Sequence, residues 1–64
     1  MALLRHDPPP QELWDRVVAW EKDLRRELDS AETPQQHALS WLGISDAYAE
    51  MAILLSRYGD EIRR

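Results

Sequence analysis

The chain has 64 residues, no cysteine and a formal net charge of −4. This length allows one domain at most, and domains of this size bury only about 60% of the surface that their unfolded chains expose. Small folds therefore depend on disulfides, metal sites or oligomerisation, and the lack of cysteine excludes disulfides and thiolate metal sites together. Oligomerisation, or binding to a partner protein, is the remaining source of stability.

The charges are unevenly spread along the chain. No Lys or Arg lies between Glu27 and Ser56, whereas Asp46 and Glu50 both fall in that stretch. Proteins that bind nucleic acids neutralise phosphates with basic residues, so this pattern argues against a nucleic-acid partner. Met1–Leu4 is followed at once by Arg5, which leaves no apolar segment long enough for a signal peptide. We therefore expect a cytoplasmic protein.

The first helix is predicted over about residues 9–29, after a short N-terminal arm at residues 1–8. Its start is indicated by three prolines at 8–10, which the first turn of a helix tolerates, and Asp7 is a candidate cap. Five large apolar residues then recur at spacings of three or four, which is the pattern of one apolar helix face. These residues are the predicted core of a helical hairpin: Leu13, Val17, Trp20, Leu24 and Leu28.

The second helix is predicted to begin at Thr33-Pro34. Thr33 is a typical N-cap, Pro34 suits the first helical position, and Gln36 completes a capping box. The connection from the first helix is short, and short connections join antiparallel neighbours. The sequence therefore predicts an all-α protein with a single domain over residues 1–64, folded as an antiparallel helical hairpin of two long helices and the short arm.

The second helix, over about residues 34–58, is unusually apolar. Fourteen of these 25 residues are hydrophobic. Large residues form a heptad stripe that Ile62 would continue, and this stripe is the predicted oligomer or partner interface: Trp41, Ile44, Tyr48, Met51, Leu55 and Tyr58. A neighbouring stripe of small residues would let another helix come close: Ala38, Ser45, Ala49, Ala52 and Ser56. Leu42 and Ile53 lie beyond it, and the first helix has apolar surface for only one of the two stripes.

Both ends of the hairpin carry further expectations. The arm, through Leu3 and Leu4, is placed to fold over the end of the longer second helix near Leu55 and Tyr58. Gly59 either ends that helix as a left-handed cap or allows a weakened continuation to about residue 63. We favour the continuation, because Ile62 keeps the heptad spacing.

The sequence contains no pattern typical of a catalytic, metal or membrane-spanning segment. Its two histidines, His6 and His37, are far apart, and the only glycines are Gly43 and Gly59, so no phosphate-binding loop or metal cluster is expected. Asp46 and Glu50, one turn apart near the middle of the apolar helix, would each cost several kcal/mol in lipid. We expect a protein that is not an enzyme, has no cofactor and does not enter a membrane.

The run Arg57-Tyr58-Gly59-Asp60 after a helical hairpin is similar to the end of the plasmid-encoded RNA-binding hairpin dimers of the Rop type. The similarity covers four residues, and the loop length and the charge distribution differ from that family. It implies only an architectural analogy, and a shared fold does not give function.

Three functions follow from these patterns. The first is a protein–protein interaction module, a small accessory or regulatory protein whose hairpin dimerises into an antiparallel four-helix bundle with the second helix in its centre. The second is a small subunit whose second helix packs onto a larger partner, such as an enzyme or a toxin. The third is a Rop-like hairpin dimer that binds nucleic acid.

Overall fold

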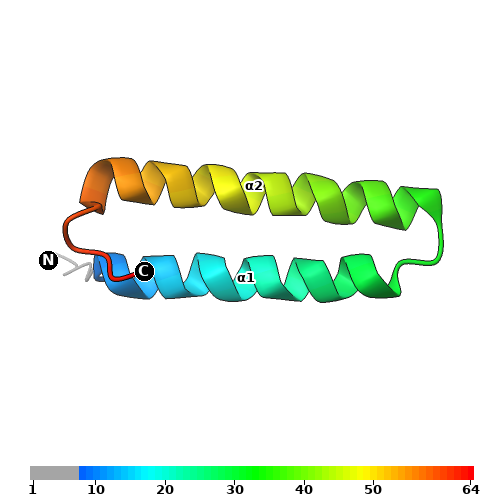
Figure 1. The fold of residues 1–64 in the computed structure, drawn as a ribbon, viewed down its shortest axis with the longest axis horizontal. Coiled ribbons are helices and arrows are strands. Elements are labelled where there is room, and N and C mark those ends of the chain that lie inside the picture. Colours follow the sequence, from blue (N-terminus) through cyan, green and yellow to red (C-terminus); the bar gives the residue numbers. More distant parts are fainter. Residues whose placement is uncertain (1–7) are drawn as a thin grey trace, which may run out of the picture.

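The computed structural model describes residues 8–64 as two antiparallel helices joined by a short loop (Figure 1). Helix α1 covers Pro10–Ser30 and helix α2 covers Pro34–Tyr58. The two helices contact each other along their length, and this part of the chain contains no strand. The predicted all-α hairpin is confirmed.

The start of α1 is fixed by proline and backbone rather than by a capping side chain. Pro10 occupies the first helical position, and the Pro9 carbonyl accepts hydrogen bonds from the amides of Glu12 and Leu13, at 2.9 and 3.2 Å. The expected cap, Asp7, lies outside the described residues, as do Leu3 and Leu4 of the arm. At the other end, the Ser30 hydroxyl donates to the carbonyls of the preceding turn, and Ala31 leaves the helix in an extended conformation.

The predicted capping box at the start of α2 is confirmed. The Thr33 hydroxyl accepts a hydrogen bond from the Gln36 amide at 3.1 Å, and the Gln36 side chain accepts one from the Thr33 amide at 3.2 Å. The same Gln36 oxygen also accepts from the Glu32 amide at 2.7 Å. Three backbone donors that no helix carbonyl can reach are thereby satisfied, so the reversal of the chain needs only residues 31–33.

The two helices meet along one line of residues on each helix. On α2 this line has spacings of four and three and contains the most buried residues of the helix: Ser40, Ile44, Ala47 and Leu54. On α1 it passes through Glu21, the only buried residue of that helix, and through Leu24 one turn later. Leu24 lies against Gly43, where a β-carbon would come within 2.8 Å of a Leu24 methyl group. Gly43 therefore permits the close approach of the helices.

The chain leaves α2 at Tyr58 and does not continue as a helix to residue 63. Residues 59–61 form a turn in which the Glu61 amide donates to the Tyr58 carbonyl at 2.9 Å. Gly59 has a φ of −54°, so it is not the left-handed cap considered from the sequence. A β-carbon at this position would approach the Leu55 carbonyl oxygen to 2.7 Å, so glycine suits the exit from the helix.

The turn brings the C-terminal segment back across the open end of the hairpin (Figure 1). Ile62 is only 6% exposed there, although it no longer follows the helical heptad. The Gln11 side chain holds the segment by both polar atoms: it accepts from the Arg63 amide at 2.7 Å and donates to the Arg63 carbonyl at 3.1 Å. This segment closes the end of the hairpin that the arm was expected to cover.

Replacing Thr33 by Ala should lower the free energy of unfolding by about 1 kcal/mol, because the Gln36 amide loses its acceptor. Urea denaturation followed by circular dichroism, at one protein concentration, measures the change. The matched control is Gln35→Ala, an exposed neighbour in the same turn, which should leave the midpoint almost unchanged. Equal losses in the two variants would contradict a stabilising role for the capping box.

Candidate interaction face

Helix α2 carries five of the six large apolar side chains that are exposed in residues 8–64. Four of them lie away from the line of contact with α1, beside a row of small residues: Trp41 55%, Leu42 63%, Tyr48 45% and Ile53 45%. The fifth, Leu39, is 67% exposed and lines a hollow beside the loop. Single exposed apolar residues are ordinary on protein surfaces, but a contiguous patch marks an interaction site. We call the side of α2 that carries these four residues and the small residues between them the outer face.

The outer face has large side chains along its two edges and small side chains between them. One edge consists of Trp41, Tyr48 and the half-buried Leu55, and the other of Leu42 and Ile53. Between the edges lie only small, exposed residues, at spacings of three, four and seven: Ala38, Ser45, Ala49, Ala52 and Ser56. These spacings return to the same side of an α-helix. The face thus has small side chains along its middle, where another helix can approach closely.

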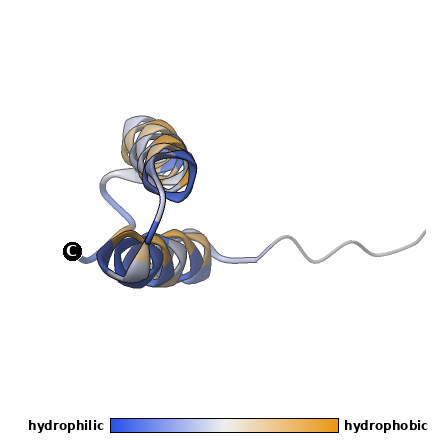
Figure 2. Ribbon diagram, turned by 90° about the vertical axis from the view of Figure 1, so that its right-hand side faces the viewer, coloured by the Kyte–Doolittle hydropathy of each residue, from blue (hydrophilic) through white to orange (hydrophobic). Residues whose placement is uncertain are grey.

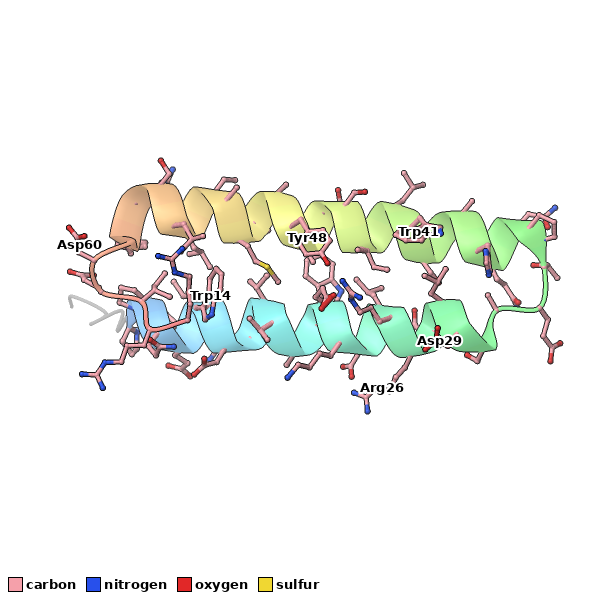
Figure 3. The ribbon with its side chains drawn as sticks, in the orientation of Figure 1. Trp14, Arg26, Asp29, Trp41, Tyr48 and Asp60 are labelled. Carbon is pink, nitrogen blue, oxygen red and sulfur yellow. The ribbon has the colours of Figure 1, made fainter. Side chains whose placement is uncertain are left out.

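Figures 2 and 3 show how this face is oriented. The hydrophobic stretches of α1 lie toward α2, whereas those of α2 are not confined to the side that faces α1 (Figure 2). Trp14 lies in the space between the helices, while Tyr48 reaches from α2 toward α1 and Trp41 lies along α2 (Figure 3). Helix α1 therefore covers one side of α2 only.

The six residues predicted as an interface divide between the two sides of α2. Ile44 is 2% exposed and Met51 and Tyr58 are half-buried, all on the side that packs against α1. Trp41 and Tyr48 belong to the outer face, and Leu55 lies at its border. The line of contact with α1 thus includes part of the large stripe, together with Ala47 and Leu54, which lie next to that stripe and are buried.

The predicted core of α1 shows a similar one-position difference. Leu13, Val17, Leu24 and Leu28 are half-buried, as expected of a two-helix protein, but Trp20 is 40% exposed. The neighbouring Glu21 occupies the position that faces α2 and is 7% exposed. The residues of α1 that face α2 recur at spacings of three and four: Trp14, Val17, Glu21 and Leu24. We call the line of contact between the two helices the seam, and Trp20 lies beside it. A carboxylate at a core position was not predicted.

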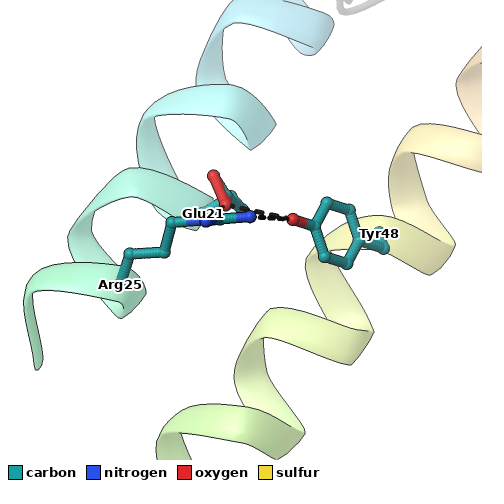
Figure 4. A network of polar contacts seen from close by, with 3 residues as sticks. All are labelled: Glu21, Arg25 and Tyr48. Atoms are coloured by element: carbon teal, nitrogen blue, oxygen red, sulfur yellow. Dashed lines mark hydrogen bonds and ion pairs between the residues drawn. The ribbon is translucent and has the colours of Figure 1, made fainter. Parts of the chain in front are cut away.

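The Glu21 carboxylate is held in a polar cluster at the middle of the hairpin (Figure 4). Arg25, one turn along α1, forms an ion pair with it and also donates to the Tyr48 hydroxyl of α2. The Tyr48 hydroxyl in turn donates to Glu21 at 3.4 Å. The carboxylate, and after it the Tyr48 hydroxyl, raises the pKa of the Arg25 guanidinium above its ordinary value. Since arginine is already cationic at neutral pH, the cluster carries a permanent cation.

The cluster has a structural consequence and no evident chemical one. A buried carboxylate without a cation and hydrogen bonds would be costly. The turn of α2 that carries Tyr48 must therefore lie opposite Glu21. The described residues contain no group of three His, Cys, Asp or Glu able to hold a metal. A hollow of about 330 Å³ beside the loop includes none of the three cluster residues and is lined by Glu27, Ser30, Ala31, Gln36, Leu39 and Ser40.

Helix α2 is long and apolar enough, by length and composition, to cross a membrane, and only 22% of its most apolar window is buried. The same two properties describe a helix that packs against a protein partner. Asp46 and Glu50, both exposed, lie within the helix one turn apart, and charges at that depth are expensive in lipid.

Comparisons with family models, curated proteins and solved structures found no significant match to this chain. Its function is therefore inferred from the outer face and the charges beside it.

The polar cluster predicts an asymmetry between two substitutions. Arg25→Met should destabilise the hairpin, because it leaves the Glu21 carboxylate in the seam without its cation. Glu21→Leu should be neutral or stabilising, because the exposed Arg25 and Tyr48 can both be solvated when the carboxylate is gone. Urea denaturation of both single variants and the double variant measures the effects at one protein concentration.

The double variant Glu21→Leu/Arg25→Met serves as the control. It should recover most of the stability that Arg25→Met loses, since no carboxylate remains to be stranded. A loss in Glu21→Leu as large as that in Arg25→Met would show that the ion pair itself stabilises the fold.

Proposed function

We propose that this protein is a non-catalytic protein–protein interaction module that forms a homodimer through the outer face of α2. Two hairpins then make a four-helix assembly with the α2 helices in the centre and an α1 helix on each outer side. In this role the chain acts as a small accessory or regulatory protein, and we propose that it is cytoplasmic.

The observation that carries the proposal is the exposure of the outer face beside a nearly complete hairpin seam. Ile44 and Ala47 are 2% and 0% exposed, so the seam is already filled within one chain. No described segment covers Trp41, Leu42 or Ile53, which remain about half exposed or more. Helices that are apolar nearly all round belong in the interior of an assembly.

The size of the chain supports the same proposal. A core this small commonly contributes no more than about 3–5 kcal/mol of stability. In residues 8–64 no large side chain is less than 2% exposed, so the seam is thin. A second hairpin on the outer face adds apolar burial without lengthening the chain, and its free energy of association adds to the stability of the fold.

The alternative of a larger partner protein uses the same face. Its row of small residues between larger apolar ones also suits an amphipathic helix of another protein. The two proposals differ in the state of the isolated chain, which is a dimer at micromolar concentration in the first and a monomer in the second. A Rop-like nucleic-acid function receives no support from the outer face, because the charged residues next to it on α2 include the acidic Asp46 and Glu50.

The central test is Ala49→Glu, which places a charge in the middle of the outer face without touching the seam. The wild type should sediment as a dimer at micromolar concentration. The variant should dissociate at least about thirtyfold more readily, because an unpaired carboxylate would be buried between the helices. Sedimentation equilibrium gives both constants, and circular dichroism shows whether the helices persist.

Ala19→Glu is the matched control, because Ala19 is exposed on α1 and lies away from the outer face. It should leave the mass unchanged. A wild-type chain that is folded and monomeric would contradict the homodimer and favour the larger partner. A dimer that tolerates Ala49→Glu would place the interface elsewhere.

A further inference from the structure

We propose that the hollow beside the loop binds an arginine side chain from a basic segment of a partner protein. The hollow has a volume of about 330 Å³, at the lower end of the range for small-ligand sites. The last turn of α1 and the first two turns of α2 line it, and no residue of the outer face contributes to it. The inference therefore does not depend on the homodimer, and it gives the protein a second interaction surface.

The buried Ser40 is the observation that points to a ligand. Ser40 lies in the seam, lines the hollow and is only 6% exposed. None of the hydrogen bonds within residues 8–64 involves its hydroxyl, whereas the Ser30 hydroxyl donates to two carbonyls of α1. No unpaired side-chain oxygen in these residues is sealed from solvent, so the Ser40 hydroxyl opens into the hollow. A buried polar group without a partner is costly, and a ligand in the hollow would supply that partner.

The charges around the hollow favour a cation. Glu27 lines the hollow and is exposed, and its carboxylate forms no ion pair within residues 8–64. The two arginines that precede it are engaged elsewhere. Arg25 pairs with Glu21, and Arg26 pairs with Asp23 and points away from α2 (Figure 3). The Glu27 carboxylate is therefore left for a cation from outside the hairpin.

The ends of the two helices do not offset this negative charge. Helix α1 ends beside the hollow with no basic residue in its last turn. The start of α2 lies at the same end of the hairpin, but the Gln36 amide there is already bonded to the Thr33 hydroxyl. The dipoles of two antiparallel helices largely cancel where their opposite ends lie together. Glu27, with Asp29 and Glu32 close by in the chain, thus decides the sign of the potential.

The groups that line the hollow fit an arginine side chain. Leu39 and Ala31 offer apolar surface for its aliphatic stem. The Glu27 carboxylate can accept two hydrogen bonds from the planar guanidinium, and the Ser40 hydroxyl can accept a third. Lysine carries the same charge but cannot make the paired contact with a carboxylate, so arginine is the better match.

The Gln36 side chain favours a protein segment over a free polyamine. Its oxygen accepts from the amides of Glu32 and Thr33, which hold the side chain in place at the hollow. Its NH₂ group donates to no group within residues 8–64, and it therefore remains able to donate to a ligand. A polypeptide has carbonyl acceptors next to its arginine side chain, whereas a protonated polyamine has donors only. An arginine within a polypeptide can thus pair with all three polar side chains.

Titration of the isotope-labelled protein with a blocked alanine–arginine–alanine tripeptide, followed by amide chemical shifts, tests the site. We expect a Kd of the order of 1 mM, because one ion pair and a few hydrogen bonds contribute. The shift changes should be concentrated at Ala31, Gln36 and Ser40 and absent at Ala49 of the outer face. A tripeptide with citrulline in place of arginine, which is neutral and of similar shape, should bind at least about tenfold more weakly.

Two variants test the groups that carry the inference. Glu27→Gln should weaken tripeptide binding at least about tenfold, because a neutral amide replaces the carboxylate. Its matched control is Asp29→Asn, an exposed carboxylate near Glu27 that does not line the hollow, and the loss there should be less than about twofold. Ser40→Ala should weaken binding at least about threefold, yet leave the urea midpoint unchanged or higher, because its hydroxyl has no partner in the free protein.

Several results would overturn the inference. Equal binding of the citrulline tripeptide, or no shift changes at about ten times the expected Kd, would exclude an arginine site. An equal loss in Asp29→Asn would show that the general acidity of the loop end attracts the peptide. A lower urea midpoint in Ser40→Ala would show that the hydroxyl is already bonded within the hairpin. Spermidine that binds as tightly as the tripeptide, at the same amides, would contradict the assignment to a protein segment.

Discussion

A single helix can cover only one side of its neighbour, and this constraint shapes the whole molecule. Helix α2 carries apolar side chains around most of its circumference, while α1 carries one apolar line and a charged outer surface. Once α1 and the Ile62 segment are in place, the seam is filled and the opposite side of α2 is not. The uncovered side is a consequence of the composition of α2 and not of a loose hairpin, since Ala47 and Ile44 are almost fully enclosed.

The position of Glu21 gives this thin seam its register. An apolar line with spacings of four and three can slide by one heptad against another at little cost, because each layer resembles the next. A carboxylate in the middle removes that freedom, since it must lie where Tyr48 can donate to it and Arg25 can stay at the surface. Gly43 acts in the same sense, because the Leu24 side chain fits only where the β-carbon is missing. Both features specify an arrangement more than they stabilise it.

Much of the fold could be predicted from local signals, whereas the faces of the helices could not. The capping box at Thr33 and the prolines before residue 11 determine where the helices begin, because these effects act within one turn. The side of α2 that faces α1 depends on the rotation of both helices about their axes, and a rotation of about 100° exchanges Trp20 for Glu21. Hydrophobicity alone would place Trp20, and not Glu21, in contact with α2. Val17 and Leu24 are half-buried as predicted, and the observed rotation half-buries Trp14 while Trp20 stays 40% exposed. Arg25, one turn after Glu21, makes the carboxylate tolerable.

Tyr48 connects the seam to the outer face. Its hydroxyl belongs to the cluster with Glu21 and Arg25, while its ring, 45% exposed, forms part of an edge of the outer face. The register of the hairpin therefore sets where the Tyr48 ring stands along the outer face, because its hydroxyl must reach Glu21 and Arg25. A shift of the seam by one heptad would move Glu21 and Arg25 about 10 Å along α2, away from the Tyr48 hydroxyl. The buried carboxylate that costs the hairpin an apolar contact thus fixes the position of a residue of the outer face as well as the register of the two helices.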